Sequence, residues 1–197
     1  MQFLKHKAYN MRRWSIIAPA QAGSGHTTSC LSAADIMSVI FFHAMRYEVD
    51  NYSNPDNDRF ILSKGHASPL LYAAWREVGV LTDEDMMTYR QVDSVLEGHP
   101  TLRFPYTEAA TGALGVGLSI GVGEALSAKM AKRNFYTYVL LGDSETAEGA
   151  VWEAVQLAAY YNLDNLIAII DCNRLGQATE TMYGHRLQRY ERVFSAF

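Results

Sequence analysis

Two oxygen-bearing side chains follow apolar segments of the sequence. Asp143 comes directly after the segment 136–142, and Asn173 comes shortly after the segment 166–170. Carboxylate and amide oxygens, completed by carbonyl, phosphate and water oxygens, suit the octahedral shell of Mg²⁺. A helix is expected after Asp143, and the N–H groups at its start would favour a phosphate. The pair therefore indicates a site for a metal diphosphate, although a helix cap at Asp143 and a turn at Asn173 explain the two residues equally well.

The histidines form a second pattern, because several of them directly follow a glycine. These are His26, His66, His99 and His185. A preceding glycine permits a positive φ, so that the imidazole can be presented in a tight loop. Neutral imidazoles can hydrogen-bond sugar hydroxyls or move protons near neutral pH. The separations match no zinc-ligand spacing, and each histidine taken singly also fits a structural role in a loop.

Other sequence patterns exclude several classes of enzyme. The stretch TGALGVGLSIGVG, residues 111–123, lacks the GxGxxG spacing of a dinucleotide site, which disfavours NAD. It indicates a helix packed closely on its neighbours, or a backbone pressed against a flat ligand at residues 112–114. The chain has neither a P-loop nor a GxSxG nucleophile elbow. Cys30 lies near His26 in sequence, but no orienting group for a Cys–His nucleophile is identifiable.

The elements that must position these residues alternate between strands and helices. Strands that are apolar on both faces, separated by helices, predict an α/β fold in which a parallel sheet carries helices on both faces. Ligands of such sheets bind beyond the carboxyl ends of the strands, where Asp143, Asn173 and His66 are expected. The predicted strands cover 59–63, 136–142 and 166–170, and the predicted helices cover 1–20, 32–47, 69–78, 113–131 and 147–161. Ser32 with Asp35 three residues later is close to a capping box, the helix 69–78 should stop at Gly79, and Thr82 and Asp85 open a further short helix.

Composition places the chain among ordinary globular proteins. It has 197 residues, of which 49% are hydrophobic and 19% charged, and no linker-like stretch, so we expect a single domain over residues 1–197. The net charge of −4 gives no footprint for nucleic acid. No uninterrupted apolar run reaches the roughly 18 residues of a membrane span. Two cysteines and the absence of a signal-like N-terminus favour the cytoplasm.

Together, these motifs resemble the N-terminal, diphosphate-binding domain of transketolases, most of all the animal-type enzymes. The resemblance runs from about residue 12 to residue 195 in family order. It implies the thiamine-diphosphate-binding fold of the PP type, and it favours transketolase over related thiamine-diphosphate synthases or dehydrogenase subunits. The segments that carry it are AGSGHTTSCLSAADIMSVIFFHAMRY, NDRFILSKGHASPLLYA, EGHP, TGALGVGL, LLGDSETAEGAVWEA and NLDNLIAIIDCNRLGQ.

The resemblance implies a role for individual residues toward the cofactor, thiamine diphosphate. Asp143, Asn173 and the backbone carbonyl of Leu175 would hold Mg²⁺ or Ca²⁺. The diphosphate would be contacted by His66, Ser144 and Asn173. The cofactor channel would be lined by Ser29, Gly112 and Leu114.

The resemblance also implies the residues that take part in catalysis. His26 and His99 would face the thiazolium ring and the oxygens of the donor sugar. Glu148 would belong to a carboxylate network across a subunit interface. The expected catalytic residues are His26, His66, His99 and Glu148.

Two residues depart from the family pattern. Thr27 stands where the family usually has proline, which fixes φ in the loop that holds His26. Ser144 stands where the family has glycine. A serine keeps the backbone N–H that meets the diphosphate, but its Cβ would be strained if φ were positive. Its hydroxyl would hydrogen-bond the phosphate or cap the following helix.

The resemblance covers only part of a transketolase. We expect a domain shortened at its C-terminus, without the pyrimidine-binding and C-terminal domains. One hypothesis is a split enzyme of the pentose phosphate pathway, which transfers a two-carbon ketol unit between sugar phosphates with a pyrimidine-domain partner, as a homodimer or heterotetramer. The alternative is a non-catalytic, truncated homologue that acts as a dimerising or regulatory module.

Overall fold

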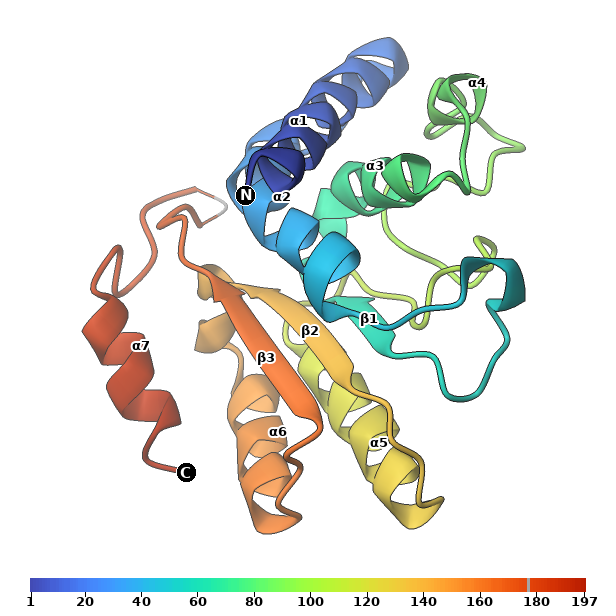
Figure 1. Cartoon of the computed structure of the whole chain (residues 1–197). Coiled ribbons are helices and arrows are strands. Elements are labelled where there is room, and N and C mark those ends of the chain that lie inside the picture. Colours follow the sequence, from blue (N-terminus) through green and yellow to red (C-terminus); the bar gives the residue numbers. More distant parts are fainter. Residues whose placement is uncertain (177) are drawn as a thin grey trace. The chain divides into compact units, whose positions relative to one another are not determined.

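The computed structural model describes residues 1–176 and 178–197 (Figure 1). These residues form two compact units. The helical unit comprises Met1–Asp58 and Gly65–Gly112, and the sheet unit comprises Arg59–Lys64 and Ala113–Phe197. The sequence led us to expect one domain, which stays a prediction.

The helical unit is built on three helices that pack against one another. Helix α1 contacts α2 and α3, and α2 contacts α3 (Figure 1). Their shared core includes the buried side chains of Met11, Met37 and Trp75. The helices of this unit are α1 (Gln2–Ala22), α2 (Thr27–Val39), α3 (Ser68–Val78) and the short α4 (Asp83–Met86), with a π-helical turn at Ile40–Ala44 and 3-10 turns at Val49–Asn51 and Gly65–Ala67.

The predicted start of α2 was wrong. The sequence suggested a capping box at Ser32, whereas the helix begins at Thr27, with His26 at the N-cap. Asp35, the expected capping partner, instead forms an ion pair with Arg12 of α1. Contact between helices has therefore overridden the local capping signal.

The apolar helix Thr27–Ala44 is long and apolar enough to cross a membrane, judged by length and composition only. A core helix passes the same test. Ala33, Ala34 and Met37 of this helix are fully buried inside the helical unit. The contacts of α2 with α1 and α3 are those of such a core helix.

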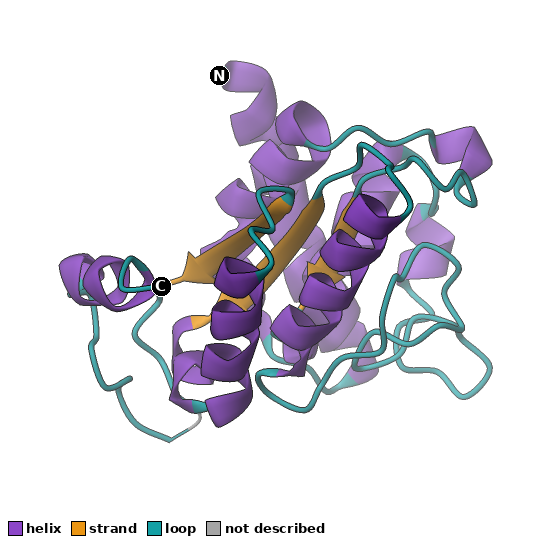
Figure 2. Cartoon of the chain, turned by 90° about the horizontal axis from the view of Figure 1, so that it is seen from below, coloured by secondary structure: helices purple, strands orange, loops and turns teal. Residues whose placement is uncertain are grey.

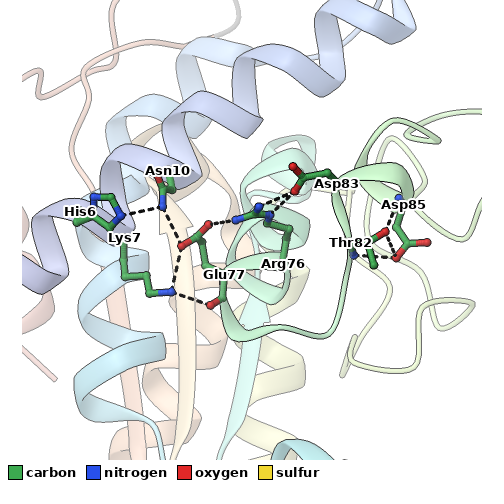
Figure 3. Close-up of polar contacts among 8 residues, drawn as sticks. All are labelled: His6, Lys7, Asn10, Arg76, Glu77, Thr82, Asp83 and Asp85. Carbon is green, nitrogen blue, oxygen red and sulfur yellow. Dashed lines mark hydrogen bonds and ion pairs between the residues drawn. The ribbon is translucent and has the colours of Figure 1, made fainter.

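Helix ends in the second half of the helical unit follow their sequence signals. Helix α3 ends at Gly79, which adopts a left-handed conformation with φ 103°. Before α4, the Thr82 hydroxyl accepts a hydrogen bond from the Asp85 N–H, and the Asp85 carboxylate accepts one from the Thr82 N–H (Figure 3). The predicted stop at Gly79 and the predicted helix start at Thr82 are both confirmed.

A buried carboxylate joins α1 to α3. Glu77 accepts hydrogen bonds from Asn10 and Arg76 and pairs with Lys7 (Figure 3). Burial alone would raise the pKa of Glu77, but the hydrogen bonds from Asn10, Lys7 and Arg76 outweigh it and hold that pKa below its ordinary value. The carboxylate is therefore ionised at neutral pH and ties the two helices together.

The sheet unit contains three parallel strands in the order β1-β2-β3. They are β1 (Arg59–Leu62), β2 (Thr137–Gly142) and β3 (Leu166–Asp171). The unit also holds α5 (Val116–Met130), a 3-10 helix at Asp143–Ala147, α6 (Gly149–Tyr160) and α7 (Leu187–Phe194). Helix α5 packs on all three strands and α6 packs beside α5 (Figure 1, Figure 2). The predicted α/β fold with a parallel sheet is confirmed.

Close packing explains two glycines of α5. A Cβ at Gly117 would lie 2.5 Å from the Ser63 side chain, and one at Gly121 would lie 2.4 Å from a methyl group of Val139. Neither distance is possible for real atoms, so the helix lies against the strands only because these side chains are missing. The glycine-rich stretch thus owes at least this part of its composition to packing, as one of the two interpretations proposed.

Candidate functional site

The predicted site residues fall in two groups, one in each compact unit. In the sheet unit, Asp143 begins the 3-10 helix that follows β2, and it is only 2% exposed. Its Oδ2 accepts hydrogen bonds from the Arg174 N–H and the Thr181 hydroxyl, both at 2.8 Å, and its Oδ1 accepts one from the Ser144 N–H at 3.0 Å. All three donors are neutral, and no described residue forms an ion pair with Asp143. Buried charges are normally paired or bound to a metal.

Asn173 lies two residues beyond β3, on the segment whose Arg174 N–H reaches Asp143. Its Oδ1 accepts a hydrogen bond from the Leu175 N–H at 2.8 Å, and its Nδ2 donates to Oδ2 of Asp171 at 3.3 Å. The carboxamide is therefore held on both sides.

Asn173 contacts an ion pair of a lysine and an aspartate. The sequence patterns did not single out either residue. Lys64 follows β1, Asp171 ends β3, and Nζ of Lys64 lies 2.6 Å from Oδ2 of Asp171. The two side chains are only 1% and 7% exposed. The sequence signal that could have indicated this pair is a charged residue near the end of each of two apolar strands, Lys64 after β1 and Asp171 in β3.

The oxygen chemistry of this region fits a hard divalent cation. A cavity of about 500 Å³ is lined by Asp143 and Ser144 together with Trp152, Thr181 and Met182. No group of three or more His, Cys, Asp or Glu among the residues described could hold a metal ion. A cation here would thus depend on amide, carbonyl, phosphate and water oxygens in addition to one carboxylate, which are ligands suited to Mg²⁺ or Ca²⁺.

In the helical unit, the predicted histidines do come together. Nε2 of His66 lies 2.7 Å from the Ser29 hydroxyl, and the rings of His26 and His66 are 5.4 Å apart, edge to face. A Cβ on Gly112 would lie 3.1 Å from the ring of His99, so this glycine allows the backbone to approach the imidazole. The structure thus groups five of the predicted residues within this unit.

The environment of His99 favours its neutral form. Burial comes first, and the nearby His26 and Arg90 add to it in lowering the pKa of His99. At neutral pH its imidazole therefore has a free acceptor nitrogen, as a group that takes up a proton must have.

The structure gives two different reasons for a glycine before these histidines. Gly25 has a φ of 152°, which favours glycine as expected. The two that precede His66 and His99 have no positive φ, and they instead leave room for a neighbour. A Cβ on Gly65 would lie 2.8 Å from Thr111, and one on Gly98 would lie 2.6 Å from the guanidinium of Arg90.

Comparison with known proteins decides the family. The family of transketolase thiamine diphosphate binding domains matches residues 5–194. The chain belongs to this family. It is 48% identical over 198 residues to human transketolase, which aligns with 100% of this chain and 32% of the human protein. The crystal structure of transketolase from Campylobacter jejuni superposes with a TM-score of 0.90 at 32% identity, over 98% of this chain and 32% of that chain.

A relative of a different organisation also matches. It is a protein of Phocaeicola vulgatus that is named as one subunit of an apulose-4-phosphate transketolase. The two are 44% identical over 155 residues, which are 79% of this chain and 55% of that protein. The chain spans about a third of the length of the animal transketolases that it matches. The resemblance inferred from the motifs is confirmed.

Ser144, which stands where the resemblance implied a glycine, is not strained in this transketolase-family domain. It is absent from the described non-glycine residues with a positive φ. It is partly buried, lines the cavity next to Asp143, and uses its N–H toward the Asp143 carboxylate. The backbone at this position therefore accepts a serine without conformational cost.

Glu145, close to Asp143 in the 3-10 helix, is a buried carboxylate that the sequence did not single out. It is fully buried, and its carboxylate accepts hydrogen bonds from the Ser63 hydroxyl at 2.7 Å, the Gly115 N–H at 2.9 Å and the Gly142 N–H at 2.8 Å. These donors lie after β1, before α5 and at the end of β2. One carboxylate thus fixes the three segments that surround the start of the 3-10 helix.

The other predicted residues of the sheet unit are exposed. Glu148 stands at the N-cap of α6, and Leu114 and Leu175 present their side chains to solvent. The Leu175 backbone takes part in an antiparallel bridge with Glu180. An interfacial role for Glu148, a channel role for Leu114 and a carbonyl ligand at Leu175 stay predictions.

Proposed function

We propose that this domain binds thiamine diphosphate through Mg²⁺ or Ca²⁺. We further propose that it serves the transfer of a two-carbon ketol unit from a ketose phosphate to an aldose phosphate. The observation that carries the proposal is the buried Asp143 carboxylate, which has only neutral donors around it and lines a cavity of about 500 Å³. A divalent cation would supply the missing positive charge, and a diphosphate would complete the shell around that cation.

The sheet unit would hold the cation and the charged end of the cofactor. Asp143, Asn173 and the carbonyl of Leu175 would be the protein ligands of the metal. Ser144, which lines the cavity, would add its hydroxyl to the contacts of the diphosphate. Once bound, thiamine diphosphate supplies the carbon nucleophile that ketol transfer needs.

The helical unit would supply contacts to the cofactor and would move protons. Ser29, His66 and Gly112 would contact the cofactor, with the His66 imidazole oriented by the Ser29 hydroxyl. His26 and His99 would face the sugar. Because the pKa of His99 is lowered, its neutral imidazole can accept a proton from a sugar hydroxyl at neutral pH.

We propose that the pyrimidine-binding domain is supplied by a partner polypeptide. The support is the similarity to a protein that is named as one subunit of a transketolase. The assembly would be a homodimer of this chain or a heterotetramer with its partner, with Glu148 at an interface between chains. It would act in the cytoplasm on sugar phosphates of the pentose phosphate pathway.

The test is a thermal unfolding experiment with the chain alone and with a polypeptide that supplies the pyrimidine-binding domain. Mg²⁺ and thiamine diphosphate together should raise the melting temperature of the complex, since a ligand at 100 times its Kd stabilises by about 2.7 kcal/mol. Asp143→Ala should abolish the rise. Asp164→Ala is the control, because Asp164 is an exposed residue paired with Lys129 on the surface. No rise in the complex would overturn the proposal and would favour a non-catalytic module that dimerises or regulates.

A further inference from the structure

We propose that the buried Lys64–Asp171 pair is a positioning device that fixes the carboxamide of Asn173 for the cation site. This inference rests on the proposed function, since it concerns the second protein ligand of the proposed metal. It assigns a role to two residues outside the expected ligand set, which act through Asn173 and do not touch the cation.

The Lys64–Asp171 pair connects the two outer strands of the described sheet. β2 lies between β1 and β3, so Lys64 after β1 and Asp171 at the end of β3 come from the two outer strands. Their contact of 2.6 Å therefore crosses the carboxyl end of β2. A Cβ on Gly142, the last residue of β2, would lie 3.9 Å from the Cβ of Lys64. The lysine thus passes over the strand end from which Asp143 emerges.

The Asp171 carboxylate sets the orientation of the Asn173 carboxamide. Oδ2 of Asp171, which receives the Lys64 ammonium, also accepts the Asn173 Nδ2–H at 3.3 Å. An ionised carboxylate can only accept hydrogen bonds, so it selects the NH₂ side of the carboxamide. The oxygen side must then point the other way, where it accepts the Leu175 N–H at 2.8 Å. A flipped amide would set its oxygen against the carboxylate.

The positive charge of Lys64 balances the negative charge of Asp171. Without Lys64, Asp171 would be a second buried carboxylate at the same edge of the sheet as Asp143. The Lys64 ammonium compensates this charge, and its contact at 2.6 Å holds in place the Oδ2 atom that accepts the Asn173 Nδ2–H. Lys64 therefore fixes the Asp171 carboxylate, and through it the orientation of the amide.

The competing explanation is that the pair only stabilises the fold. Three variants separate the two explanations: Lys64→Met, the nearly isosteric Asp171→Asn, and the control Arg46→Met. Arg46 pairs at 2.9 Å with Asp58, whose side chain is fully buried. The control therefore also removes the cation that pairs with a buried carboxylate, but it does so in the helical unit. Asn173→Ala serves as the reference for loss of the ligand itself.

The experiment measures the Kd of Mn²⁺ by electron paramagnetic resonance, in the presence of thiamine diphosphate and the partner chain. Lys64→Met and Asp171→Asn should each raise that Kd by about 10–100-fold, the usual effect of losing a group that orients a metal ligand. Arg46→Met should leave it unchanged. The Asn173 side-chain NH₂ resonances in ¹⁵N-labelled protein should shift in Asp171→Asn before any metal is added.

Each outcome decides a different claim. If Asn173→Ala weakens Mn²⁺ binding while a folded Lys64→Met or Asp171→Asn binds like the parent, the positioning role is overturned and the proposed function stands. If the parent complex binds no Mn²⁺, both fail together. Should Lys64→Met not fold, Asp171→Asn carries the test, since it preserves the shape of the side chain.

Discussion

Two aspartates at the ends of neighbouring strands have different partners for their negative charges. Asp171 at the end of β3 and Asp143 after β2 are both buried. Asp171 receives the ammonium of Lys64, whereas the described residues offer Asp143 two backbone N–H groups and the Thr181 hydroxyl, and no cation. Only Asp143 lines the cavity. One carboxylate thus has a cation within the protein, while the other has the neutral surroundings that the proposed cation site requires.

The thiol of Cys172, the residue after β3, is affected by the charges of both carboxylates. Burial comes first, and the negative charges of Asp143 and Asp171 follow, in raising the pKa of Cys172 to about 11. Cys172 is therefore a protonated thiol at neutral pH. Cys30 is fully buried, with its sulfur 3.4 Å from the backbone oxygen of His26. Both observations disfavour a cysteine nucleophile.

The largest expected effect comes from removing the internal cation. Lys64→Met should lower the free energy of unfolding by about 3–5 kcal/mol, because it leaves Asp171 as a buried, uncompensated charge. The double variant with Asp171→Leu should recover most of that loss, since an apolar pair of similar size replaces the ion pair. Urea unfolding of the four members of this cycle measures both effects. A double variant no more stable than Lys64→Met would show that Asp171 does not carry the cost.

A smaller effect should follow from removing a neutral donor at Asp143. Thr181→Val deletes the hydroxyl that donates to Oδ2 at 2.8 Å, and should lower the free energy of unfolding by about 1–2 kcal/mol in the absence of cation. With saturating Mg²⁺ and thiamine diphosphate the loss should shrink, because the cation then balances the same charge. Urea unfolding with and without the ligands checks both values.

Glu145 supplies the matched control for this experiment. It is also buried, and its three donors are neutral as well, but it does not line the cavity. Glu145→Gln leaves at least one of these donors without its acceptor, at a cost of about 1–3 kcal/mol. That loss should be the same with and without ligands. If the cation reduced it as much as the loss in Thr181→Val, the distinction between the two carboxylates would fail.

The sequence predicted the part of the site that follows from strand ends alone. In a parallel sheet, residues that follow successive strands gather at one edge, which was sufficient to single out Asp143 and Asn173. Lys64 and Asp171 could not be paired in the same way. Their contact joins residues 107 apart in the sequence and depends on β2 lying between β1 and β3. Strand order is a property of the folded sheet that no local pattern encodes.

Glu145 and the start of α2 were missed for the same reason. The donors of Glu145 come from three segments, and an acidic residue near the start of a helix has an ordinary explanation in the helix dipole. Ser32 and Asp35 formed a plausible cap until α1 provided Arg12 as a partner. Signals within a few residues, such as the Thr82 cap and the stop at Gly79, were read correctly because their partners are local.

The smallest expected effect concerns Glu77 in the helical unit, a buried carboxylate that has two internal cations, Lys7 and Arg76 (Figure 3). Because its pKa in the folded protein lies below the ordinary value of 4.5, Glu77 stabilises the fold above that pH, and this contribution is lost as the pH falls through the lowered pKa. Glu77→Gln should therefore destabilise the chain at neutral pH and flatten its acid sensitivity, whereas the exposed Glu84→Gln should do neither. Urea unfolding at pH 7 and below pH 4.5 measures the difference. Added Mg²⁺ should change none of these values, since the Glu77 charge is already balanced within the helical unit. A cation-dependent result at Glu77 would mean that the ligand acts on the whole chain and not through Asp143.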